Sequence, residues 1–190
     1  EFPFVLVDAL YLKVRENGRV VSRGVLVGVG INESGRRELL GMMVGNSESE
    51  ESWNAFFRGL KQRGLHGVDL VVSDDHGGLV RAIHKQFQGV TWQRCQTHFI
   101  RNIMDATPKA LKEEVYQHVR AILDAPDADS ARMLLNQTLA KYSEKVPKAM
   151  QILEAGFDDA TAVLCLPDKY RQRLRTTNTV ERLNEEGRRR

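Results

Sequence analysis

The spacing of apolar residues changes near residue 95, and this change most constrains the fold. Up to about residue 94, short apolar runs alternate with amphipathic segments, whereas from about 95 to 175 apolar residues recur only at helical intervals. Alternating strands and helices are typical of the α/β class. We therefore predict a sheet-containing core in residues 1–94, an all-α insertion in residues 95–175 and a final core helix in residues 176–190.

Five segments of the core are predicted to be strands. Segment 4–12, FVLVDALYL, is nearly all apolar and rich in β-forming residues, which is typical of a buried strand. Asn17-Gly18 is a strong hairpin signal, so the next strand is expected to pair antiparallel with the first. The other predicted strands cover residues 19–31, 37–45, 68–73 and 89–94.

Two amphipathic helices are predicted between these strands. Ser47 and Glu50 have the spacing of a capping box, and the helix that follows is expected to end near Gly64. The inward-facing residues are Trp53, Phe56, Phe57 and Leu60 in the first helix, and Leu79, Val80, Ile83 and Phe87 in the second. The order of these elements predicts an α/β fold with a mixed five-stranded sheet.

The insertion contains three apolar stripes at helical spacing. The third stripe, around Ile152 and Leu153, is expected to end at Gly156. The other two consist of Leu111, Val115, Val119, Ile122 and Leu123, and of Ala131, Leu134, Leu135, Leu139 and Tyr142.

A last helix is predicted after the insertion. Thr176-Thr177-Asn178 is expected to cap it, with Val180 and Leu183 facing inward. No terminating signal follows before the end of the sequence. We therefore expect the sequence to be part of a longer protein, truncated at both ends.

Positive charge is concentrated near the end of the sequence. The net charge is +3, and residues 167–190 hold eight basic residues against four acidic ones. A basic end on a near-neutral body suits a polyanion such as DNA, although a solvated charged helix has the same composition. The candidate phosphate contacts are Lys13 and Arg15, which also suit an ordinary strand end, and Arg171, Arg173 and Arg175.

The cysteine count and the hydropathy indicate a compartment. Two cysteines, Cys95 and Cys165, are too few for a disulfide framework. No apolar run approaches the length of a membrane span, and no signal peptide precedes the first predicted strand. We therefore expect a cytoplasmic protein with no membrane partner.

Three carboxylates occupy positions that suggest a metal site. Asp8 lies within an apolar strand, Asp74 ends a buried strand, and Glu181 begins the last helix. In a mixed sheet the first and fourth strands can be neighbours, which would place Asp8 beside Asp74. Burying two like charges is costly unless a cation neutralises them, and carboxylate oxygens are ligands that Mg²⁺ prefers.

Each carboxylate also has an ordinary structural interpretation. An Asp in a strand can lie at an edge or bulge, and an Asp that ends a strand can cap a turn. Asp75 competes with Asp74 as the second ligand, and Asn178 and Glu181 have the spacing of a capping box. The residues taken alone leave these alternatives open.

Four motifs, in order across the whole chain, narrow the choice. FVLVDALYLKVR, VVSDDHGGLVRAI, QRCQTHFIRN and TTNTVERLN together resemble the mutator-type family of bacterial insertion-sequence transposases. The resemblance implies a ribonuclease-H-like fold with a DDE active site and an α-helical insertion between its second Asp and its Glu. It assigns the catalytic positions to Asp8, to Asp74 (the Asp that follows Ser73) and to Glu181, which would hold two Mg²⁺ or Mn²⁺ ions.

The resemblance also implies an activity and its partners. These are metal-dependent cleavage and strand transfer of DNA, with transposon ends and target DNA as partners, a homo-oligomer when DNA is bound, and action on the bacterial nucleoid. A ribonuclease-H-like nuclease or resolvase, and a non-catalytic DNA-binding or assembly fragment, are the alternatives.

Two further motif positions have a supporting role in this interpretation. Cys95 and His98 form the family's C-x-x-H motif. Structural zinc needs four ligands, so we favour a local structural or active-site-supporting role over zinc. His76, two residues after Asp74, is expected to approach the metals or a phosphate, although it can also simply complete a turn.

Overall fold

The computed structural model describes residues 1–45, 49–178 and 180 of the chain. These residues form two compact units. The sheet unit comprises Glu1–Trp92 together with Thr177, Asn178 and Val180, and the helical unit comprises Gln93–Thr176. The division places the start and the end of the chain in one unit, with the helical unit between them in sequence.

A five-stranded mixed sheet forms the centre of the first unit, in the order β3-β2-β1-β4-β5. β1 pairs antiparallel with β2 and parallel with β4, and β2 pairs antiparallel with β3. The strands are β1 (Phe4–Glu16), β2 (Arg19–Ile31), β3 (Arg37–Gly45), β4 (Leu70–Ser73) and β5 (Thr91–Arg94). All five predicted strands are confirmed, and β1 continues four residues beyond the predicted end.

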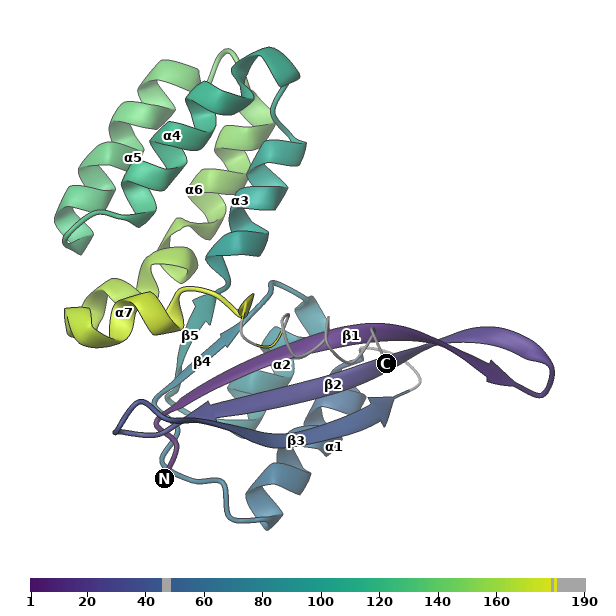
Figure 1. Ribbon diagram of the computed structural model, residues 1–190. Helices are drawn as coiled ribbons and strands as arrows, with labels where there is room; N and C mark the ends of the chain where they lie inside the picture. Colours follow the sequence, from purple (N-terminus) through teal and green to yellow (C-terminus); the bar gives the residue numbers. More distant parts are fainter. Residues whose placement is uncertain (46–48, 179, 181–190) are drawn as a thin grey trace. The chain divides into compact units, whose positions relative to one another are not determined.

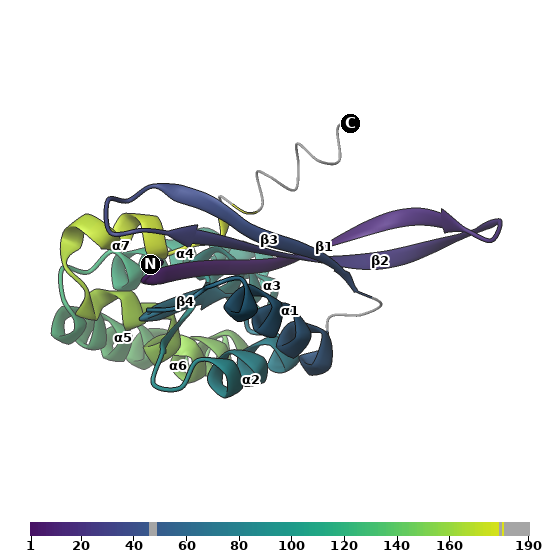
Figure 2. The same ribbon diagram turned by 90° about the horizontal axis from the view of Figure 1, so that it is seen from below.

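Helices α1 (Glu50–Gln62) and α2 (Gly77–Gln86) lie side by side on one face of this sheet (Figure 1 and Figure 2). The N-cap of α1 is Ser49, whose Oγ accepts a hydrogen bond from the Ser52 backbone N–H at 3.2 Å. This cap lies within the predicted capping-box run of residues 47–50, of which Ser47 is outside the described residues. The core between helices and sheet consists of Val5, Val7, Leu26, Trp53, Phe56, Phe57, Leu60, Val71, Leu79, Ala82, Ile83, Phe87 and Trp92.

The helical unit is built from amphipathic helices around its own core. The helices are α3 (Gln96–Asp105), α4 (Lys112–Leu123), α5 (Ala128–Tyr142), α6 (Pro147–Thr161) and α7 (Asp168–Leu174), with 3₁₀ turns η1 (Lys109–Leu111) and η2 (Ala162–Cys165). Asp127 caps α5, because its side chain accepts the Ser130 N–H at 2.7 Å, and this bond lowers the pKa of the Asp127 carboxyl. None of the helices in the described residues is long and apolar enough to cross a bilayer.

Gly156 lies inside α6 and does not end it. The helix continues to Thr161, so the expected end at Gly156 was wrong. A Cβ at this position would lie 2.5 Å from Cε2 of Phe99 and 2.7 Å from Nη1 of Arg94. The glycine is therefore required by the close approach of α3 to α6, whose side chains share one core.

Gly156→Ala is expected to lower the free energy of unfolding by about 1–3 kcal/mol, because the added methyl group overpacks this contact. Gly59→Ala is a suitable control, since Gly59 also lies inside a helix and its Cβ would meet nothing within 4 Å. That variant is expected to be more stable by about 0.5–1 kcal/mol. Urea denaturation followed by circular dichroism measures both, and a Gly156→Ala protein as stable as the wild type would contradict the packing role.

Candidate active site

Asp8 lies on the sheet face opposite α1 and α2. Side chains alternate between faces along a strand, and Val5 and Val7 belong to the core under the helices. Leu6, Asp8 and Leu10 therefore point to the other face, which we call the carboxylate face. Asp8 is only 9% exposed, and its Oδ1 accepts the backbone N–H of Ala9 at 2.9 Å.

The register of β1 and β4 relates the position of Asp74 to that of Asp8. The last parallel pair is Leu6–Val72, and both Asp8 and Asp74 follow it by two residues. Adjacent strands are about 4.8 Å apart, and residues in register share a face. If the pairing geometry continued for two more residues, the two carboxylates, 66 positions apart in sequence, would be neighbours on the carboxylate face.

The environment of Asp74 favours an external cation. Its Oδ1 is buried, and within the described residues it has no hydrogen-bond partner. A buried carboxylate oxygen without a partner is costly, and a second carboxylate beside it adds repulsion. A hard divalent cation would relieve both costs, so this donor set fits Mg²⁺ or Mn²⁺.

Ser73 and Trp92 hold the backbone at Asp74. The Trp92 indole N–H donates to Ser73 Oγ at 2.9 Å, and the Ser73 hydroxyl donates to the Asp74 carbonyl oxygen at 2.8 Å. Ser73 is fully buried at the end of β4. The motif letters S-D contain this serine, but the tryptophan that orients it comes from β5 and could not be identified from spacing.

The neighbouring residues Asp75 and His76 differ in position from Asp74. Asp75 is exposed, whereas Asp74 is partly buried and, like Asp8, follows the last β1–β4 pair by two residues. His76 is partly buried and stands at the N-cap of α2, where its side chain forms no capping hydrogen bond. The N-terminal end of α2, where backbone N–H groups attract anions, therefore lies close to Asp74 in sequence.

Glu181 and Leu183 lie outside the described residues. Thr177 is fully buried, and its carbonyl oxygen accepts the N–H of Val180 at 2.7 Å. Asn178 and Val180 are helical, and Val180 is fully buried, as expected for an inward-facing residue of the last helix. The role of Glu181 stays a prediction.

The sequence of this chain matches one protein family and several known transposases. Residues 1–190 match the model "Transposase, Mutator family". The chain belongs to the Mutator family of transposases. It is 44% identical to the transposase for insertion sequence element IS256 in transposon Tn4001 of Staphylococcus aureus, over 100% of this chain and 49% of that protein.

Two other relatives are similarly close. The transposase for insertion sequence element ISRM5 of Rhizobium meliloti is 42% identical over 100% of this chain and 48% of its own length. The transposase for IS1081 of Mycobacterium tuberculosis is 42% identical over 100% of this chain and 46% of its own length. The chain thus spans about half the length of these relatives.

The C-x-x-H motif of this Mutator-family chain lies at the start of α3. Cys95 is fully buried at the N-cap of the helix, and His98 is partly buried one turn later. Among the described residues, no three His, Cys, Asp or Glu side chains are grouped to hold a metal ion. This finding includes Cys95 and His98, and it leaves open a set completed by Glu181.

The polar residues around this motif form a buried network that sequence reasoning missed. The Gln93 side-chain amide donates to the Ala160 carbonyl oxygen at 2.8 Å, and its Oε1 accepts the Val163 N–H at 2.6 Å. Gln96 donates to the same Ala160 carbonyl oxygen at 2.9 Å. These bonds satisfy backbone groups where α6 passes into η2, and they fix the segment that carries Cys95.

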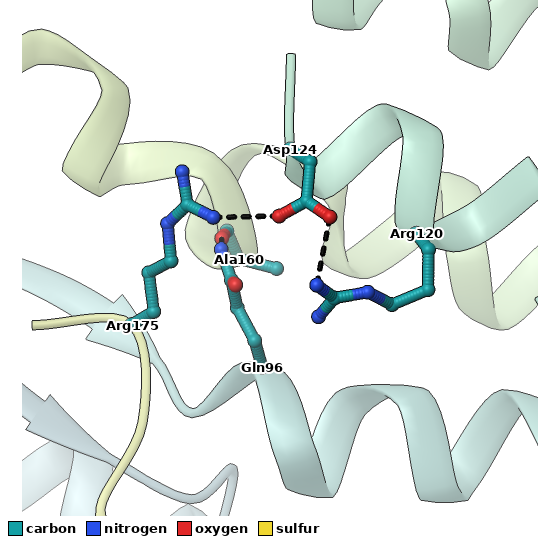
Figure 3. A network of polar contacts seen from close by, with 5 residues as sticks. All are labelled: Gln96, Arg120, Asp124, Ala160 and Arg175. Atoms are coloured by element: carbon teal, nitrogen blue, oxygen red, sulfur yellow. Dashed lines mark hydrogen bonds and ion pairs between the residues drawn. The ribbon is translucent and has the colours of Figure 1, made fainter. Parts of the chain in front are cut away.

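Two of the predicted DNA-contacting arginines have partners within the helical unit. Figure 3 shows Asp124 between two guanidinium groups, with Arg175 Nη1 at 2.6 Å and Arg120 Nη2 at 2.7 Å. Arg171 donates to the carbonyl oxygens of Pro126, Leu164 and Leu166.

Burial separates the predicted DNA contacts further. The Arg171 and Arg175 side chains are 15% and 21% exposed, so packing accounts for much of their role. Arg173, Lys13 and Arg15 are exposed to solvent. Contact with DNA phosphate stays a prediction for all five.

The carboxylate pair predicts an unusual effect on stability. In a buffer that chelates metal ions, Asp74→Asn is expected to raise the free energy of unfolding by about 1–2 kcal/mol, because it removes a carboxylate whose Oδ1 is buried without a hydrogen-bond partner within the described residues. Asp69→Asn, which changes an exposed carboxylate on the same segment, is expected to stay within about 0.5 kcal/mol of the wild type. Thermal and urea unfolding give both values. A destabilised Asp74→Asn protein would mean that the protein itself satisfies this carboxylate.

Proposed function

We propose that this chain is the catalytic core of a DNA transposase, in which Asp8, Asp74 and Glu181 hold two Mg²⁺ or Mn²⁺ ions. The observation that carries the proposal is that Asp8 and Asp74 each follow the last β1–β4 pair, Leu6–Val72, by two residues. The partnerless Oδ1 of Asp74 among the described residues supports it. The relatives are transposases of insertion sequences, which adds the substrate class.

The fold assignment is part of this proposal. The strand order β3-β2-β1-β4-β5, with three antiparallel strands and a parallel β1–β4 pair, agrees with a ribonuclease-H-like core. The core would consist of residues 1–94 and 176–190, with residues 95–175 as an α-helical insertion. Such an insertion separates the second Asp from the Glu in sequence, as the family pattern requires.

The proposed chemistry is phosphodiester cleavage followed by strand transfer. Divalent ions bound at the three carboxylates supply charge neutralisation for the attacking and leaving oxygens. The protein would position the scissile phosphodiester against the carboxylate face, where Asp8 and Asp74 would hold the ions. One DNA strand is hydrolysed at the transposon end, and its freed 3′-hydroxyl then attacks a target phosphodiester in line. No covalent protein–DNA intermediate is required.

The proposed partners are the transposon ends and the target DNA, both within the bacterial cytoplasm on the nucleoid. Two ends must be joined to one target, so we propose a homo-oligomer when DNA is bound. His76, at the N-cap of α2, would support the phosphate beside Asp74. Cys95 and His98 would support the core through the segment that follows β5.

Nicking of supercoiled plasmid in Mn²⁺ and transfer of a 3′-hydroxyl oligonucleotide into plasmid test this function. Asp8→Asn, Asp74→Asn and Glu181→Gln are expected to lower both rates by about a thousandfold or more, since each removes several kcal/mol of charge stabilisation. Asp75→Asn is the matched control and is expected to keep activity within a few-fold of the wild type.

Each outcome of that assay distinguishes among functions. Full activity of the Asp8→Asn or Asp74→Asn protein would refute the assigned site, and an inactive Asp75→Asn with an active Asp74→Asn would move it by one residue. Nicking without strand transfer in the wild type would indicate a nuclease. No nicking in the wild type, with DNA binding retained, would indicate a DNA-binding or assembly fragment.

A further inference from the structure

The β1–β2 hairpin extends beyond the rest of the sheet. β3 pairs with β2 only from Gly24 to Ile31, whereas β1 and β2 pair as far as Glu16 and Arg19. Residues Leu12–Arg23 therefore form a two-stranded ribbon that projects past the end of β3 (Figure 1 and Figure 2). We call this ribbon the β-arm.

The β-arm has little apolar support of its own. Only Leu12, Val14 and Val21 are partly buried among its apolar residues, and Val20 is 62% exposed. A two-stranded ribbon alone is marginally stable in water. Its tight turn is fixed by Asn17 and Gly18, whose positive φ values of 49° and 79° suit a type I′ hairpin. A rigid turn on a thin, exposed ribbon is the form expected of an element that completes its contacts by binding a partner.

The positive net charge of the β-arm favours a polyanion as that partner. The arm holds four basic residues against one acidic residue, so its net charge equals the +3 of the whole chain. Arg23 Nε donates to Glu16 at 2.9 Å, and this bond lowers the pKa of the Glu16 carboxyl. Within the described residues the remaining three cations take part in no ion pair; they are Lys13, Arg15 and Arg19, and all are exposed.

The three cations are divided between the two faces of the ribbon. Lys13 and Arg15 are two residues apart on β1 and therefore share one face. Arg19 pairs with Glu16 and therefore lies on the other face. A flat anionic surface would be met by one face only. The major groove of B-DNA admits a two-stranded ribbon and presents phosphates on both sides, so duplex DNA matches this arrangement.

The same strand connects the β-arm to the carboxylate pair. Lys13 is five residues beyond Asp8 on β1, and Glu16, opposite Arg19, is eight residues beyond. At about 3.3 Å per residue these separations are about 17 and 26 Å. Because base pairs are spaced by about 3.4 Å, they correspond to about five to eight base pairs of duplex aligned with β1.

We propose that the β-arm is a DNA-gripping ribbon, which contacts duplex phosphates about five to eight base pairs from the phosphodiester held at Asp8 and Asp74. The inference rests on the proposed function for the position of that phosphodiester. The arm takes no part in bond breaking; its cations position the duplex. It adds Arg19 and the turn at Asn17 and Gly18 to the set of residues that meet DNA.

Duplex binding at several salt concentrations tests the arm. A variant that combines Lys13→Thr, Arg15→Thr and Arg19→Thr keeps strand-forming residues but removes three charges. Each lost phosphate contact reduces the magnitude of the negative slope of log K against log salt by about 0.9. The slope measured by fluorescence anisotropy is therefore expected to become shallower by about 2.7. A matched variant removes three exposed charges of the helical unit, Arg101→Gln, Lys109→Gln and Lys148→Gln. Its slope is expected to change by less than about 1.

Crosslinking locates the contact. A photoreactive group is attached at Val20→Cys in a Cys165→Ser background, because Cys165 is exposed and Cys95 is fully buried. On an end-labelled duplex, crosslinks are expected about five to eight base pairs from the principal Mn²⁺-dependent cut.

The outcomes separate the arm from the catalytic site. Equal salt slopes for the wild type and the arm variant would overturn the β-arm proposal even when nicking persists, as would crosslinks scattered without relation to the cut. A wild type that binds DNA with the expected slope difference but never cuts would refute the proposed catalysis and leave the arm as a DNA-binding element.

Discussion

The parallel pairing of β1 with β4 is the constraint on which the site depends. It places Asp8 and Asp74 two residues beyond the same pair, Leu6–Val72. A slip of one residue would turn one carboxylate to the helix-covered face, where apolar side chains leave no place for it. Because side chains alternate between the two faces along a strand, the two faces of the sheet carry different kinds of side chain. The side of Val5 and Val7 packs against α1 and α2, while Asp8 lies on the other side.

Much of the fold could be predicted because its signals are local. Asn17-Gly18 carries the backbone preference of a hairpin in two residues, and the helical spacing of Trp53, Phe56, Phe57 and Leu60 marks a buried stripe. The choice between Asp74 and Asp75 could not be made this way. That choice depends on how two strands distant in sequence pair with each other. The family pattern assigned Asp74, and the β1–β4 pairing, which ends two residues before both Asp8 and Asp74, supports the same assignment.

What sequence reasoning missed depends on distant partners. A glycine is common at helix ends, yet Gly156 lies within α6. Its missing side chain leaves room for the ring of Phe99 of α3, 57 residues earlier. Arg175 was named as a candidate phosphate contact, and nothing in the sequence indicated that Asp124, 51 residues earlier, is its ion-pair partner in the folded chain. The far end of β1 was also missed, because apolar residues define a strand only where it is buried, and the strand continues to Glu16 as an exposed ribbon.

Calorimetric titration of Mn²⁺ into the wild-type chain and into Asp8→Asn tests the central claim, which is that Asp8 and Asp74 together form a divalent-cation site. The account predicts a saturable heat of binding in the wild type that is lost in Asp8→Asn, with Asp75→Asn behaving as the wild type. Binding that is unchanged in Asp8→Asn, or saturable binding that is lost in Asp75→Asn instead, would contradict it.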